Sequence, residues 1–119
     1  MPSFANPFQG NVKGKMSNAE LMQALRLDIA SELEAIFLYD AHYLATDDPA
    51  AKAVLGDIRD EEKAHVGELI TLMRYLDPKE ADSFFHGENE VKEMLEELGM
   101  SDSDSEKAIN HRVGSLKED

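Results

Sequence analysis

Hydrophobic residues recur with a helical period through the first half of the chain, and polar residues fill the positions between them. The pattern begins after residues 1–16, which hold two prolines and two glycines and show no such period. Ser17 is followed three residues later by Glu20, the arrangement of a capping box, in which each side chain bonds the other residue's backbone N–H. Residues 18–45 contain no Gly or Pro. The sequence therefore predicts a long helix over 18–45.

A second long helix follows at once. The stretch TDDP at 46–49 ends the first helix and begins the next, with Asp47 or Asp48 as N-cap and Pro49 at the first helical position. The periodic pattern then continues to about Leu76, ahead of an Asp-Pro pair. Two helices of about 28 residues, each ~40 Å long, joined by a tight turn, predict an antiparallel hairpin in an all-α fold.

Two short helices are predicted after the hairpin. The first covers PKEADSFFHG and ends at Gly87, and the second covers NEVKEMLEELGM and stops at Gly99 in a left-handed conformation. The polar stretch 101–107, SDSDSEK, has the composition of a mobile linker. The chain thus divides into an irregular N-terminal arm (1–16), the helical hairpin with its short C-terminal helices (17–99), and a linker and tail (100–119).

Each long helix carries an apolar stripe that is interrupted near its middle by ionisable residues. The stripes consist of Leu21, Leu25, Ile29, Ile36 and Tyr39 in the first helix, and of Leu55, Ile58, Leu69, Leu72 and Leu76 in the second. Glu32 falls on the first stripe, and Glu62 and His65 fall on the second. In an antiparallel hairpin these three residues lie at one level, about 15 residues from the turn along either helix. Their neighbours Arg59, Asp60, Glu61 and Lys63 are expected to face solvent.

A metal ion explains this interruption best. An unpaired carboxylate in an apolar layer is costly, so it is usually protonated, paired or bound to a metal, and no Lys or Arg lies on either stripe at this level. Two Glu and one His, with no sulfur ligand, fit iron, manganese or zinc. The alternative is a partly exposed helix edge on which a Glu-x-x-His pair occurs by chance.

The predicted ligands make up half of a known set. A carboxylate-bridged di-iron bundle takes one Glu from each of two helices and a Glu-x-x-His pair from each of the other two. This chain supplies one helix of each kind. We therefore expect a symmetric homodimer, in which two hairpins complete a four-helix bundle and duplicate the ligands. Dimerisation also covers the apolar face that a lone hairpin exposes.

Composition narrows the class of protein. The 119 residues are about the size of one domain, and 42% of them are hydrophobic. Twelve Lys and Arg against 25 Asp and Glu give a formal charge of -13, which repels nucleic acid and anionic lipid and concentrates small cations. The absence of cysteine excludes disulfides, thiolate metal sites and cysteine nucleophiles. No run approaches the ~20 apolar residues of a membrane span, so a soluble intracellular protein is expected.

Two stretches resemble a known family. SELEAIFLYD (31–40) and RDEEKAH (59–65), with the spacing between them, are similar to the encapsulated ferritins, half-sized ferritin-like proteins carried inside encapsulin shells. The resemblance implies a ferroxidase that oxidises Fe(II) to Fe(III) with dioxygen at a di-iron centre between two subunits. It also implies a ring of dimers, expected as a decamer, in place of a closed ferritin cage.

The resemblance also assigns residues. It makes Glu32, Glu62 and His65 the iron ligands, and Tyr39 matches the tyrosine of the family's site. Glu34 matches part of an outer metal site through which iron reaches the centre. The second acidic residue of that outer site is Ser31 here, which departs from the pattern.

The C-terminus resembles the cargo-loading peptide of the same family. In VGSLKED, Val113 and Leu116 are the expected apolar anchors around Gly114 and Ser115, and the usual leucine two positions earlier is His111. The resemblance implies docking to the inner wall of an encapsulin shell, and hence a cytoplasmic location inside that nanocompartment.

Two other functions fit the same residues. One is a rubrerythrin-like di-iron enzyme that reduces peroxide, although the usual cysteine electron-delivery site is absent. The other is a non-enzymatic, acidic helical cargo protein with a structural metal.

Overall fold

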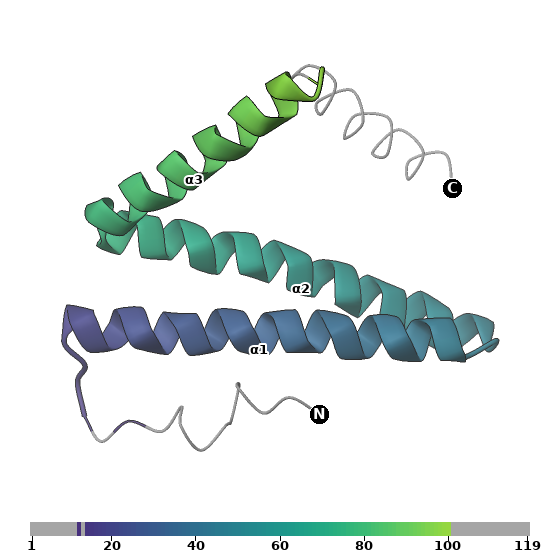
Figure 1. The fold of residues 1–119 in the computed structure, drawn as a ribbon. Coiled ribbons are helices and arrows are strands. Elements are labelled where there is room, and N and C mark those ends of the chain that lie inside the picture. Colours follow the sequence, from purple (N-terminus) through teal and green to yellow (C-terminus); the bar gives the residue numbers. More distant parts are fainter. Residues whose placement is uncertain (1–11, 13, 101–119) are drawn as a thin grey trace. The chain divides into compact units, whose positions relative to one another are not determined.

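The helical expectation is met by the computed structural model, which describes residue 12 and residues 14–100 (Figure 1). Within these residues the chain forms three helices and no strand: α1 (Asn18–Ala45), α2 (Pro49–Leu76) and α3 (Pro78–Glu97). The all-α fold and the bounds of both long helices are confirmed. Nearly all of the predicted arm and tail, with the anchors Val113 and Leu116, lies outside the described residues.

The long helices begin where local capping chemistry places them. Ser17 Oγ accepts the Glu20 backbone N–H, and Glu20 Oε1 accepts the Ser17 N–H, both at 3.2 Å, which completes the predicted capping box. Asp48 is the N-cap of α2: its Oδ2 accepts the Ala51 N–H at 2.8 Å, and Pro49 occupies the first turn. These bonds satisfy backbone donors that a helix start leaves unpaired.

Helices α1 and α2 lie antiparallel and pack against each other (Figure 1). The buried large side chains of this hairpin are Met22 and Leu25 near the start of α1 and Met73 near the end of α2, which is the end away from the turn. Between these positions the described side chains of both helices are half-buried or exposed, and the one buried residue is Gly56. The middle of the hairpin therefore has little enclosed core of its own.

Helix α3 corrects one prediction. It runs without a break from Pro78 to Glu97, so the division into two short helices at Gly87 is wrong. A glycine in a helix interior costs only about 1 kcal/mol, and the His86 Nε2–Glu90 Oε1 pair, at 2.8 Å, spans the expected break. Gly99 does adopt the predicted left-handed conformation, with φ of 81°.

The end of α3 forms a Schellman motif around Gly99. The Met100 N–H donates to the Leu95 carbonyl at 2.7 Å, and the Gly99 N–H donates to the Glu96 carbonyl at 3.0 Å. The chain divides into two compact units, Met1–Pro78 and Lys79–Asp119, so this helix belongs to a different unit from the hairpin.

Large apolar side chains remain uncovered on the hairpin. On α1, Leu33, Phe37 and Leu44 are 51%, 67% and 70% exposed, and Tyr75 on α2 is 80% exposed. None of the described helices is both long enough and apolar enough to cross a bilayer. Such a surface is typical of a chain that buries part of it against another protein.

Candidate metal centre

The structure brings the three predicted ligand residues together between the long helices. Glu32 projects from α1, and Glu62 and His65 project from α2, one helical turn apart. One donor atom from each residue lies within 4.8 Å of the other two. His65 Nδ1 is 3.5 Å from Glu32 Oε1 and 3.5 Å from Glu62 Oε2. These separations exceed good hydrogen-bond lengths, so the three side chains converge without forming strong hydrogen bonds to one another.

The two carboxylates and the imidazole differ in exposure. The side chains of Glu32 and Glu62 are 23% and 19% exposed, whereas that of His65 is 47% exposed. The cluster therefore begins in the helix interface and opens at one edge of the hairpin. His65, expected on an inner face, lies at this open edge in the single chain.

Glu32 holds a polar atom that the protein leaves without a partner. Its Oε2 is buried and accepts no hydrogen bond. A buried polar atom without a partner costs about 1–3 kcal/mol, and more when it is charged. A cation placed among the three donor atoms would satisfy this oxygen, and carboxylate and imidazole donors suit iron, manganese or zinc. The residues present fit a metal site.

The other predicted site residues lie outside this group. Tyr39, two turns after Glu32 on α1, is half-buried. Glu34 is also half-buried, and it does not belong to the convergent group found among the described residues. Ser31 beside the cluster is exposed. The roles assigned to Tyr39 and Glu34 therefore stay predictions.

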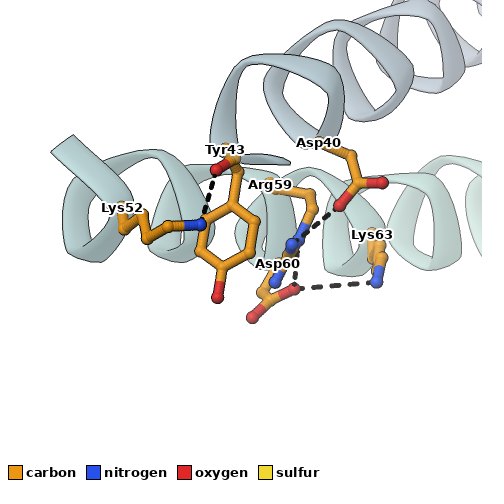
Figure 2. A network of polar contacts seen from close by, with 6 residues as sticks. All are labelled: Asp40, Tyr43, Lys52, Arg59, Asp60 and Lys63. Carbon is orange, nitrogen blue, oxygen red and sulfur yellow. Dashed lines mark hydrogen bonds and ion pairs between the residues drawn. The ribbon is translucent and has the colours of Figure 1, made fainter. Parts of the chain in front are cut away.

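Arg59 was wrongly expected to face solvent. Its side chain is only 19% exposed, and its Nη1 donates to Asp40 Oδ1 on α1 at 2.8 Å (Figure 2). Hydrogen bonds to Asp60 and then to Asp40 raise the pKa of Arg59 above its already high ordinary value. The sequence held no clear signal for this, because the isolated helix glycine Gly56 lies close to Tyr43 whereas Gly67, equally isolated in the same helix, has open space around it.

Comparison with known proteins assigns the family. A scan against family models finds no match. Among solved structures, the encapsulated ferritin domain from Pyrococcus furiosus superposes with a TM-score of 0.64 at 37% identity, over 81% of this chain and 95% of that one. The chain belongs to the encapsulated ferritin family. Its hairpin accordingly has the ferritin-like helical fold.

Curated relatives agree with this assignment. The encapsulated ferritin chain is 46% identical over 76 residues to the encapsulin nanocompartment cargo protein EncC of Myxococcus xanthus, covering 64% of this chain and 58% of EncC. It is 40% identical over 89 residues to a ferritin-like–encapsulin shell fusion protein of Pyrococcus furiosus, covering 75% of this chain and 26% of that protein. The chain thus spans about half of the first relative and a quarter of the second.

Proposed function

We propose that this chain is a ferroxidase, which oxidises Fe(II) to Fe(III) with dioxygen at a di-iron centre formed between two copies. The observation that carries the proposal is the convergence of Glu32, Glu62 and His65 within 4.8 Å, with one carboxylate oxygen of Glu32 buried and unpartnered. Iron is the substrate, and the family assignment favours it over the other metals that suit these donors.

The exposure of the cluster supports a site shared by two copies. One chain offers two carboxylates and one imidazole, half of the ligand set of a di-iron bundle. The group opens at His65, on the edge where a second hairpin could bring the other half. The uncovered apolar side chains Phe37 and Leu44 also call for burial against another protein. A symmetric homodimer meets both needs, and a decameric ring of such dimers follows the family pattern.

Charge favours two ferrous ions in the shared site. Two copies of Glu32 and Glu62 bring four carboxylates, whose formal charge when bound to metal, −4, matches two Fe(II) ions. After oxidation the two ions carry +6, so two further negative charges, such as hydroxide formed from water, are needed to balance the site.

The residues have separate tasks in this reaction. The Glu32 and Glu62 carboxylates would hold the ions and neutralise their charge, and His65 would bind as a neutral imidazole. Two Fe(II) ions give up one electron each. Dioxygen takes both electrons with two protons, and the balanced products are two Fe(III) and one hydrogen peroxide. Tyr39, half-buried on α1, is proposed as a redox-active neighbour, and Glu34 as part of an outer site for arriving iron.

The relative EncC, named as encapsulin nanocompartment cargo, supports a place inside an encapsulin shell in the cytoplasm. An open ring has no closed cavity, so storage of the oxidised iron falls to the shell. We assign docking to the C-terminal segment with Val113, Gly114, Ser115 and Leu116.

Anaerobic loading followed by air tests the ferroxidase. The protein is charged with Fe(II), oxygen is admitted, and Fe(III) absorbance and oxygen consumption are followed together. Replacing Glu32, Glu62 or His65 by Ala should abolish rapid oxidation. Glu61→Ala is the matched control, since Glu61 adjoins Glu62 but is exposed. Oxidation that survives all three replacements would contradict the proposal.

The same experiment separates the alternatives. A rubrerythrin-like enzyme would oxidise the loaded iron much faster with hydrogen peroxide than with dioxygen. A structural metal would bind and stabilise a dimer without turning over in either oxidant. Size measurement with and without Fe(II), in the absence of oxygen, reports dimer formation by mass action.

A further inference from the structure

A cluster of polar residues ties the two helices together near the turn (Figure 2). Arg59 lies at its centre: Nη1 donates to Asp40 Oδ1 on α1 at 2.8 Å, and Nε donates to Asp60 Oδ1 on α2 at 3.1 Å. Lys63 contacts only the α2 side, with Nζ 3.6 Å from Asp60 Oδ1 and a side chain that is 59% exposed. Arg59 therefore joins the helices, and Lys63 does not.

An aromatic ring fills the space beside Arg59. The Tyr43 ring has Arg59 Cζ 4.7 Å and Lys52 Nζ 4.2 Å from its centroid, both within range of cation–π attraction. Lys52 Nζ also donates to the Tyr43 carbonyl oxygen at 2.9 Å. A Cβ at Gly56 would lie 3.2 Å from Tyr43 Cε2, so only glycine admits the ring this close without displacement.

The cluster and the candidate metal centre share both helices. Arg59 is three residues before Glu62 on α2, and Asp40 is eight residues after Glu32 on α1. Along the axes these spacings are about 4.5 Å and about 12 Å. Around the axes they are about 60° and about 80°, so the two groups occupy neighbouring flanks of the same inner faces.

Besides the Arg59–Asp40 bond, the register of the helices is set by the short turn and the Lys52–Tyr43 carbonyl bond on one side of the metal centre, and by enclosed side chains on the other side. The enclosed side chains Met22, Leu25 and Met73 lie at the far end of the hairpin. A slide of α2 along α1 by one residue is about 1.5 Å, whereas metal–ligand distances tolerate only about 0.2 Å. The Arg59 guanidinium constrains this geometry because two donors of its planar fork bond different helices, Nη1 to Asp40 on α1 and Nε to Asp60 on α2.

We propose that Arg59 is a positioning residue for the metal centre: by bonding Asp40 it fixes the register that holds Glu62 and His65 opposite Glu32. The inference rests on the proposed metal-binding function. It assigns Arg59 no contact with iron, so its effect must pass through the placement of the ligands.

Cobalt(II) binding to the full chain, free of other metals, tests this role. Dissociation constant and visible absorption spectrum are measured for the wild type, Arg59→Met and Lys63→Met, with helix content checked by circular dichroism. Arg59→Met should weaken Co(II) binding about 10-fold or more, as loss of an outer residue that orients a ligand commonly does, and should alter the spectrum. Lys63→Met removes one positive charge from the same cluster and should change affinity less than about twofold.

A double-mutant cycle identifies the bond responsible. Asp40→Asn should reproduce much of the loss, and Arg59→Met with Asp40→Asn should bind Co(II) no more weakly than Arg59→Met alone. If Arg59→Met lowers the helix content, the Co(II) affinities of Asp40→Asn and Lys63→Met are compared instead. The inference is overturned if Arg59→Met keeps the wild-type Co(II) affinity and spectrum. If Arg59→Met lowers the helix content, the same result in Asp40→Asn overturns it. It is also overturned if the fold-losses of the two single variants multiply in the double variant.

The outcomes distinguish this inference from the proposed function. A wild-type chain that binds no Co(II) overturns both. A wild-type chain that binds Co(II) through Glu32, Glu62 and His65, together with an Arg59→Met variant that binds it identically, overturns the positioning role alone.

Discussion

Replacing Glu32 by leucine should stabilise the metal-free protein and remove its response to metal. Glu32 stands on the apolar stripe between Ile29 and Ile36, and its Oε2 is buried without a partner. An unsatisfied buried polar atom costs about 1–3 kcal/mol. Because the side chain is 23% exposed and its other oxygen lies 3.5 Å from His65 Nδ1, we expect the lower end, a gain of about 1 kcal/mol in the free energy of unfolding.

Metal should reverse this order of stability. A ligand present at about 100 times its dissociation constant stabilises the folded state by about 2.7 kcal/mol. The wild type should gain that amount with Co(II), and Glu32→Leu should gain almost nothing. The variant is thus the more stable protein in chelator and the less stable one in metal, a crossing that a purely structural carboxylate does not produce.

Urea unfolding followed by circular dichroism measures the free energy of unfolding of each protein in chelator and in excess Co(II). Chain concentration is held equal throughout, because dimerisation makes apparent stability depend on it. Glu61→Leu, exposed and outside the convergent group, is the control and should change stability by no more than about 0.5 kcal/mol. A Glu32→Leu protein that is less stable than the wild type in chelator would refute the reasoning, since Glu32 would then contribute to folding through its own contacts.

Three further predictions concern other parts of the chain. Gly67→Ala should raise the free energy of unfolding by up to about 1 kcal/mol, since nothing lies within 4 Å of the new Cβ, whereas Gly56→Ala should gain clearly less because its Cβ meets Tyr43 at 3.2 Å; equal gains in urea unfolding would count against the close Tyr43 contact. Gly87→Ala should raise helix content on heating and stabilise α3 by about 1 kcal/mol, because Gly87 is an interior helix position with free space around it; a loss of helix would restore the predicted break. Deleting residues 113–119 should abolish co-purification with a co-expressed encapsulin shell and leave Fe(II) oxidation by the isolated chain unchanged; retained co-purification would place docking elsewhere.

The long helices and the meeting of Glu32, Glu62 and His65 were accessible from the sequence because they depend on local or periodic signals. A capping box and a Pro in the first turn mark helix starts through bonds between near neighbours. The shared level of the three residues follows from a constant rise per residue in two antiparallel helices. Neither step needs the conformation of any side chain.

Gly87 and Arg59 were misjudged because competing local energies are of similar size. The cost of one helical glycine is about 1 kcal/mol, and good helix formers and side-chain pairs on both sides can offset it. An arginine beside an apolar stripe can extend to solvent or turn across to the facing helix. The direction of the Arg59 side chain is set by the positions of Asp40 and Tyr43 on α1. Only the packed hairpin reveals these positions.

The distribution of stabilising contacts along the hairpin explains how it tolerates a site in its middle. Buried apolar side chains close one end, at Met22, Leu25 and Met73, and the Arg59–Asp40 bond joins the helices on the turn side of the site. Between them, Glu32 and Glu62 occupy positions where leucines would pack better. The contacts on both sides of the site thus fix the alignment of the two helices, which the side chains at the site do not fix. An open centre between two ordered regions is the arrangement that the proposed shared metal site would need, because a second chain would have to reach the donors.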